Sequence, residues 1–225
     1  MPWQDWIRTV EVEPSLYAAD LSRLGDQCEA LLRTGARILH FDVGDGHFVP
    51  PITMGPIVLQ SISPLVHRYG GVLDCHLMVE EPQRHFEAVA EAGGDSVTVH
   101  YEACPDLPAV VRAAREHELE IGLAFKPKTS PEEAAAAAGG FDLVLCMSIE
   151  PGYSGQPFMP EALPRIRRLR ELLGDRVPIQ VDGGIDHENA RAAYEAGATL
   201  LVAGTAIFAR EDLPRAYRRL VQALA

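Results

Sequence analysis

Short runs rich in valine, leucine and isoleucine alternate with longer amphipathic stretches along the whole chain of 225 residues. This alternation is typical of βα units that build a parallel sheet. We expect strands over eight segments, namely residues 10–16, 37–43, 72–79, 95–102, 120–126, 142–149, 178–183 and 200–208. Eight strands of this kind are the number that closes a (β/α)8 barrel.

Eight stretches with helical periodicity separate or follow the expected strands. They cover residues 21–34, 56–66, 82–92, 107–118, 131–138, 161–173, 187–196 and 212–224. Several begin with proline, which suits a first helical turn, and glycine often follows the last turn. The sequence therefore predicts an α/β fold, a single-domain (β/α)8 TIM barrel over residues 1–225. Residues 1–9 form an N-terminal extension with Trp3 and Trp6, expected as a short amphipathic helix against the barrel or a partner subunit.

The chain is acidic, with 20 lysines and arginines against 32 aspartates and glutamates and a formal net charge of -12. This charge argues against a nucleic-acid partner, because binding to a phosphate backbone needs a basic face. Lys126 and Lys128 are the only lysines. Backbone N–H groups are therefore the expected donors to any bound phosphate.

No apolar stretch approaches the roughly 20 residues that span a membrane, and the first residues lack the pattern of a signal peptide. We therefore expect no membrane partner and a cytoplasmic location. The four cysteines show no CxxC pairing, and we expect them to be reduced and partly buried thiols.

Two histidines and two aspartates lie near the carboxyl ends of expected strands, where the active site of such a barrel is built. His40 and Asp42 share one face of their strand, because side chains alternate along a strand. His76 and Asp182 lie near the ends of two other strands. Two imidazoles and two carboxylates suit one divalent ion such as Zn, Fe(II), Mn or Co. A single histidine at a strand end is more often a structural residue, so this prediction depends on all four together.

Glycine-containing segments lie at or just after the ends of the last three expected strands, at residues 150–156, 183–184 and 203–206. Each segment alone is an ordinary turn. However, the loops after the seventh and eighth strands of a barrel commonly hold a phosphate, because glycine lets backbone N–H groups approach the anion. On the fourth strand His100 and Glu102 share a face, either as partners of the metal ligands or as hydrogen-bonded rim residues.

Six motifs occur in order along the chain. They are PSL at 14–16, HFDVGDGHFVP at 40–50, HLMV at 76–79, MSIEPGYSGQ at 147–156, VDGG at 181–184 and GTAIF at 204–208. Together they resemble the motifs of the ribulose-phosphate 3-epimerase family, from about residue 12 to residue 208.

The resemblance implies that one divalent metal ion is bound by His40, Asp42, His76 and Asp182, and that the two aspartates are the catalytic proton carriers. The implied reaction is epimerisation at carbon 3 of a ketose phosphate, from D-ribulose 5-phosphate to D-xylulose 5-phosphate through a cis-enediolate. The partners expected are a small sugar phosphate and further copies of the chain in a homo-oligomer.

The family's substrate contacts are implied at further positions. Ser15 and His76 would contact the sugar, and Met78 and Met147 would cover the reacting carbons. The residues implied for phosphate binding are Gly152, Tyr153, Ser154, Gly155, Gly183, Gly184, Gly204 and Thr205.

The chain departs from the family pattern near the expected pocket. Gly44 replaces a usual methionine, Pro51 replaces a usual asparagine, and Ser154 and Thr205 replace a glycine and a serine. Glycine at position 44 predicts a more open roof over the substrate, unless the loop that carries Pro51 fills the gap. These departures place the substrate in question more than the reaction.

Three alternatives follow from the same residues. One is an epimerase for another ketose phosphate, such as allulose 6-phosphate, and another is a non-catalytic barrel that binds a sugar phosphate. The third is a Schiff-base aldolase, for which Lys126 is the only candidate. A site like that of orotidine-phosphate decarboxylase is disfavoured, because the sequence contains no Asp-x-Lys pattern.

Overall fold

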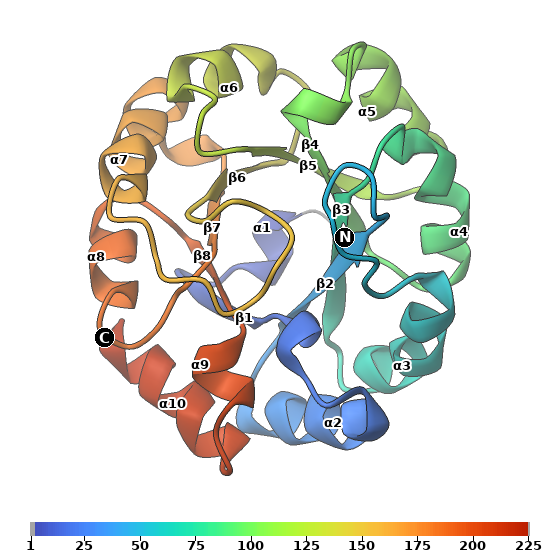
Figure 1. Cartoon of the computed structure of the whole chain (residues 1–225), viewed down its shortest axis with the longest axis vertical. Coiled ribbons are helices and arrows are strands. Elements are labelled where there is room, and N and C mark those ends of the chain that lie inside the picture. Colours follow the sequence, from blue (N-terminus) through green and yellow to red (C-terminus); the bar gives the residue numbers. More distant parts are fainter. Residues whose placement is uncertain (1–2, 225) are drawn as a thin grey trace.

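Eight parallel strands curve into a nearly closed barrel in the computed structural model, which describes residues 3–224 (Figure 1). The strands are β1 (Glu11–Pro14), β2 (Ile38–Gly44), β3 (Val72–Met78), β4 (Ser96–His100), β5 (Glu120–Phe125), β6 (Leu143–Met147), β7 (Ile179–Asp182) and β8 (Leu200–Ala203). Their order in the sheet is β1-β8-β7-β6-β5-β4-β3-β2. A bridge between Ser15 and His40 brings the first and last strands of this order together. The predicted (β/α)8 fold is confirmed.

The helices form a ring outside the strands (Figure 1). They are α2 (Leu24–Thr34), α3 (Pro56–Arg68), α4 (Phe86–Glu91), α5 (Leu107–Glu116), α6 (Pro131–Ala137), α7 (Ala162–Leu173), α8 (Ala190–Glu195) and α10 (Leu213–Ala223), with a short α9 (Thr205–Phe208) after β8. Side-chain N-caps stabilise the first turns of several of these helices. Asp106 and Asp212 accept backbone N–H groups of the first turns of α5 and α10, and Ser130 forms a capping box with Glu133 on α6.

Several expected strands extend too far, and the eighth and the fourth show the reason. The eighth was expected to reach residue 208, but it ends at Ala203, because the backbone turns at Gly204 and its carbonyl accepts the N–H groups of Ile207 and Phe208. The fourth ends at His100, and a 3₁₀ turn over Tyr101–Ala103 carries Glu102. Both corrections lie at the carboxyl ends of strands, where the chain leaves the sheet to form loops.

The N-terminal end of the barrel is closed by α1 (Trp3–Trp6). Trp3 and Trp6 are buried and meet edge to face, with ring centroids 4.9 Å apart. They pack against the first residues of several strands, namely Ile38, Val72, Leu143 and Leu200. The expected packing of the extension as a short helix against the barrel is confirmed for these residues, whereas Met1 and Pro2 lie outside the described residues.

The middle of the barrel interior is polar. Glu13, His40, Asp74 and Gln180 project from β1, β2, β3 and β7, and each is fully buried. Apolar branched side chains usually fill such a barrel, so a polar layer needs hydrogen-bond partners within the protein. This layer lies between the tryptophan-closed end and the carboxyl ends of the strands.

None of the helices within residues 3–224 has both the length and the apolar character needed to cross a membrane.

Candidate active site

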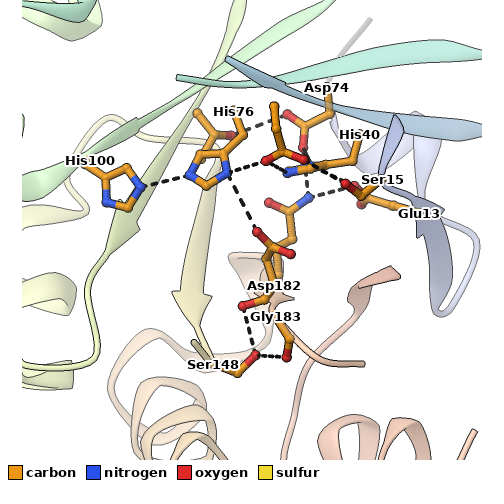
Figure 2. A network of polar contacts seen from close by, with 12 residues as sticks. Glu13, Ser15, His40, Asp74, His76, His100, Ser148, Asp182 and Gly183 are labelled. Atoms are coloured by element: carbon orange, nitrogen blue, oxygen red, sulfur yellow. Dashed lines mark hydrogen bonds and ion pairs between the residues drawn. The ribbon is translucent and has the colours of Figure 1, made fainter. Parts of the chain in front are cut away.

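The four predicted metal ligands converge at the carboxyl ends of the strands. The Cα atoms of Asp42 and His76 are register partners on β2 and β3, and Asp182 ends β7. One ligand atom from each of these residues and from His40 lies within 4.8 Å of the others. Figure 2 shows His40, His76 and Asp182 pointing toward one another. The sequence-based expectation that these four side chains gather at one point is confirmed.

His40 is prepared to bind a cation through Nε2. Its Nδ1 lies 2.9 Å from Asp74 Oδ2, which fixes the ring proton on that nitrogen. Its Nε2 is buried without a hydrogen-bond partner and lies 3.4 Å from Asp42 Oδ1. A buried imidazole nitrogen left without a partner beside carboxylates is the arrangement of a metal-ligating histidine held by a carboxylate. The residues present therefore fit a divalent metal ion.

The pKa values of the ionisable ligands also reflect a site rich in carboxylates. Burial opposes ionisation of His40, but the negative charges of Asp42 and of further carboxylates raise its pKa well above the usual value. Burial likewise opposes ionisation of Asp42, yet the two histidines hold its pKa below the usual range. Burial and the charge of Asp42 raise the pKa of Asp182 to about 6. Two aspartates in one site thus differ in proton affinity.

Beneath the ligands lies a hydrogen-bond network that the sequence analysis did not identify. Gln180 Nε2 donates to Glu13 Oε2 at 2.7 Å and to Asp74 Oδ2 at 2.8 Å, and Ser96 Oγ donates to Asp74 Oδ1 at 2.8 Å. The signal was available, because positions 74 and 180 each precede a predicted ligand by two residues and so share its face.

Glu13, His40 and Asp74 are also close enough to form a second metal cluster. Their hydrogen bonds argue against that interpretation. His40 Nδ1 is bonded to Asp74, and the amide of Gln180 donates to both carboxylates, so N–H donors occupy the positions that a cation would need. This group therefore supports the ligands from below and does not form a separate metal site.

His76 has partners on both ring nitrogens. Its Nδ1 lies 3.1 Å from Asp42 Oδ1 and 3.8 Å from Asp182 Oδ2, so this nitrogen faces the cluster. Its Nε2 lies 2.9 Å from His100 Nε2. Burial lowers the pKa of His100 to about 4, and that imidazole is therefore neutral at neutral pH.

A pocket lined by Asp42 and Asp182 opens at the carboxyl ends of the strands. Among its lining residues are all of those expected to contact substrate except His76, which lies buried beneath Asp42. These are Ser15, Met78, Met147, Gly152, Tyr153, Ser154, Gly155, Gly183, Gly184, Gly204 and Thr205. Tyr17, Ile149, Ile185 and Val202 also line the pocket and were not expected. Three of these side chains are apolar and one is a tyrosine, and none carries a sequence signal that separates it from core residues.

The loop after β7 requires glycine. Gly183 and Gly184 have φ angles of 122° and 65°, and a Cβ on Gly184 would collide with the backbone of Phe158. Ser148 Oγ donates to the carbonyls of Asp182 and Gly183 at 2.8 and 2.7 Å. This close approach of two loops places the glycine backbone at the pocket wall.

Gly44 does not open the roof of the pocket. A Cβ on Gly44 would lie 2.9 Å from the carbonyl oxygen of Pro51 and 3.0 Å from Val49 Cγ2. Val49 also approaches Gly152, so the loop after β2 reaches the loop after β6. The expectation of an open roof is therefore wrong, because the loop that carries Pro51 occupies the space.

The fold and the site together define a class of protein. It is a (β/α)8-barrel enzyme with a buried His–Asp cluster below a glycine-lined pocket. The model of the ribulose-phosphate 3 epimerase family matches residues 11–208. The chain belongs to the ribulose-phosphate 3-epimerase family, and it is an epimerase-like isomerase.

Curated relatives agree with this assignment over most of their length. The chain is 38% identical to "Ribulose-phosphate 3-epimerase" of Bacillus subtilis over 211 residues, which cover 92% of this chain and 96% of that protein. It is 41% identical to the protein of the same name from Synechocystis over 206 residues, covering 89% and 88% of the two chains.

Solved structures of lower sequence identity share the fold alone. A 3-hexulose-6-phosphate synthase superposes with a TM-score of 0.74 at 19% identity, covering 96% of this chain and all of that chain. Orotidine 5'-phosphate decarboxylase from Pyrococcus horikoshii superposes with a TM-score of 0.68 at 17% identity, covering 95% and 98%.

Proposed function

We propose that the chain interconverts D-ribulose 5-phosphate and D-xylulose 5-phosphate by epimerisation at carbon 3, with one divalent metal ion bound. The observation that carries the proposal is the convergence of His40, Asp42, His76 and Asp182 at the floor of a glycine-lined pocket. Relatives named ribulose-phosphate 3-epimerase support the choice of substrate.

Epimerisation of a 2-ketose phosphate moves one proton off carbon 3 and returns one to the opposite face. Two acid–base groups are therefore needed, one on each side of a planar enediolate. Asp42 and Asp182 both line the pocket and come from strands separated around the barrel. A bound divalent ion supplies Lewis-acid stabilisation of the negative charge on the substrate oxygens.

The surroundings of the two aspartates support different protonation states at the start of the reaction. Asp42 accepts Ser15 Oγ–H at 2.7 Å and has a lowered pKa, which favours its ionised form as the base. Burial and the charge of Asp42 raise the pKa of Asp182 to about 6, so this carboxyl group takes up a proton more readily than Asp42 and is assigned as the acid. A bound cation would lower the pKa values of both aspartates. Because the two carboxyl groups interact, they titrate as a pair. After one turnover Asp42 carries a proton and Asp182 is ionised, and proton exchange with solvent restores the starting states before the next turnover in the same direction.

The phosphate of the substrate is assigned to the backbone of the glycine loops after β6, β7 and β8. Glycines there line the pocket, and neither lysine does. The sugar carbons are assigned to the space between Met78 and Met147, which are buried side chains with few polar atoms. An anion held by backbone donors needs no lysine, which agrees with the composition of the chain.

Lys126 lies away from this chemistry. Its Nζ sits 3.8 Å from the centre of the Phe48 ring, and the residue does not line the pocket. A Schiff-base lysine must reach the carbonyl carbon of the substrate. The aldolase alternative is therefore disfavoured.

The proposal is tested with pentulose and hexulose phosphates in deuterated water. Ribulose 5-phosphate is expected to give xylulose 5-phosphate that carries solvent deuterium at carbon 3, at a higher kcat/KM than allulose 6-phosphate gives its epimer. Turnover confined to the hexulose phosphate would replace the proposed substrate. Tight binding without exchange at carbon 3 of any substrate would show a binding protein instead of an enzyme.

A further inference from the structure

His100 stands behind a metal ligand and does not reach the pocket. It is fully buried, and its ring stacks on that of His76 with centroids 5.0 Å apart and an interplanar angle of 27°. Its Nε2 lies 2.9 Å from His76 Nε2 (Figure 2). Two imidazole nitrogens at this distance must share one proton between them, as donor and acceptor.

The direction of this hydrogen bond follows from the cluster. His76 Nδ1 faces the carboxylates of Asp42 and Asp182, so this nitrogen must offer its lone pair when a cation is bound. The ring proton of His76 is then on Nε2, which donates to His100 Nε2. His100 must in turn carry its own proton on Nδ1, because a neutral imidazole has one N–H.

Glu102 accepts the hydrogen bond that His100 Nδ1–H donates. Its Oε2 lies 3.4 Å from His100 Nδ1, a long contact, and its Oε1 accepts the N–H of Lys126 at 2.8 Å and the hydroxyl of Thr129 at 2.5 Å. These bonds lower the pKa of Glu102 to about 2 against the effect of burial, so the group is an anion. The chain of bonds thus runs from His76 through His100 to a carboxylate at the rim.

The two histidine ligands are therefore held in different ways. His40 donates directly to the buried carboxylate of Asp74, whereas on the side of its ring away from the cluster His76 reaches a carboxylate through a second imidazole. Carboxylate partners of this kind fix the tautomer of a ligating histidine and raise its basicity. His76 would otherwise be free to place its proton on the nitrogen that faces the cluster.

We propose that His100 and Glu102 are positioning residues that keep His76 in the tautomer with a free Nδ1, and thereby strengthen metal binding. This inference rests on the metal site of the proposed function. Neither residue lines the pocket, so neither touches the substrate. Their effect is on the affinity for the ion, which can be measured without turnover.

A purely structural role for His100 predicts something different. Its ring also contacts Phe48, with centroids 4.8 Å apart, so the imidazole could serve only to fill the space between Phe48 and His76. Phenylalanine at position 100 keeps a ring in this space and removes both nitrogens. Glutamine removes the ring, but its amide can accept from His76 Nε2–H and donate to Glu102.

The experiment measures zinc affinity by competition with a chelator in the parent, H100F, H100Q and E102A. We expect H100F to bind zinc about 10- to 100-fold more weakly than the parent, H100Q to recover most of that loss, and E102A to lie between them. His67 pairs with Asp95 outside the site, so H67F is the control for a histidine-to-phenylalanine change and should keep the parent affinity. Folding of each variant is checked by its thermal transition in the chelated state.

A spectroscopic readout covers the case in which a variant does not fold. Imidazole ¹⁵N shifts of the zinc-loaded parent should show His76 protonated at Nε2 and His100 protonated at Nδ1. The opposite tautomers, or equal zinc affinities of the parent and a folded H100F, would overturn the assignment of His100 while leaving the metal-dependent reaction intact. A parent that binds no divalent ion would overturn the proposed function and this inference together.

Discussion

Asp42 and Asp182 have the same side chain, but their surroundings give them different proton affinities. Two histidines and the Ser15 hydroxyl stabilise the charge on Asp42, whereas burial and the charge of Asp42 oppose ionisation of Asp182. Neighbouring carboxyl groups with separated pKa values are a frequent sign of an acid–base pair. At the residue scale the proposed division of roles therefore depends on what surrounds each carboxylate.

The first prediction concerns these two carriers. Asp42→Asn and Asp182→Asn are each expected to lower net epimerisation by about 10²- to 10⁴-fold, because a proton must be handled on both faces. Each epimer of the substrate presents its carbon 3 proton to one of the two aspartates. The variant that keeps that aspartate is expected still to exchange this proton with deuterium. The rates are compared by coupled assay and by NMR, with zinc content checked in parallel. Near-parent epimerisation by either variant would contradict the two-base assignment.

Glu13 provides a prediction about pH. Burial raises its pKa to about 7 from an ordinary value near 4.5. The folded chain therefore holds this proton more tightly than the unfolded chain, and its contribution to stability is lost as the pH rises from about 4.5 through 7. The effect is on the order of 3 kcal/mol, since one pKa unit corresponds to about 1.4 kcal/mol.

Glu13→Gln tests this contribution, because glutamine cannot ionise and can still accept from Gln180. Between pH 5 and pH 8, in the presence of a chelator, the parent is expected to lose more of its free energy of unfolding than E13Q. The exposed Glu91→Gln serves as the control and should follow the parent. Parallel pH curves for the parent and E13Q would show that Glu13 titrates normally.

At the scale of elements, α1 is an addition to the part of the chain that the family model covers, which begins at residue 11. Its two tryptophans close the N-terminal end of the barrel, opposite the carboxyl ends that carry the site. Stability and activity are therefore expected to separate when this helix is altered.

Trp3→Ala is expected to lower the free energy of unfolding by about 3–5 kcal/mol, as for other large buried aromatic residues. Values of kcat and KM at 25 °C should stay within about twofold of the parent, because the pocket residues keep their positions. Ile57→Ala is the matched control, since that side chain is 85% exposed and its loss should change little. Denaturant unfolding and steady-state kinetics give the two measurements. A stability loss below about 1 kcal/mol would show that α1 is not an integral part of the barrel.

For the whole molecule, the proposed metal site links strands of the barrel. The four proposed ligands come from β2, β3 and β7, so one ion at the cluster would be held by distant parts of the sequence. A ligand that binds only the native state stabilises it, by about 2.7 kcal/mol at a free concentration 100 times its Kd. Removal of the ion should therefore affect folding as well as turnover.

Chelation is expected to abolish epimerisation and to lower the Tm, and one equivalent of a divalent ion per chain should restore both. Zn, Fe(II), Mn and Co are compared in the same assay, since the donor set suits each of them. Full activity in a metal-free sample would contradict the proposed mechanism. The expected homo-oligomer stays a prediction as well, and the mass in solution tests it.

The sequence by itself predicted the barrel and the convergence of His40, Asp42, His76 and Asp182. Strand and helix periodicities are local properties, and eight βα units in succession leave one architecture. The same alternation placed His40 and Asp42 on one face, and barrel geometry brought His76 and Asp182 to the same end. Strand ends were predicted less well. At Gly204, for example, a local turn ends β8 although the apolar sequence pattern continues to Phe208.

Only the tertiary structure decided which groups support the ligands. Gln180 bonds to Glu13 and Asp74 across the barrel, and His76 bonds to His100 on the next strand. Such contacts depend on strand register and on side-chain rotamers, which no local pattern encodes. The loop that carries Val49 and Pro51 likewise fills the space beside Gly44. The absence of a side chain at Gly44 therefore leaves no gap in the structure.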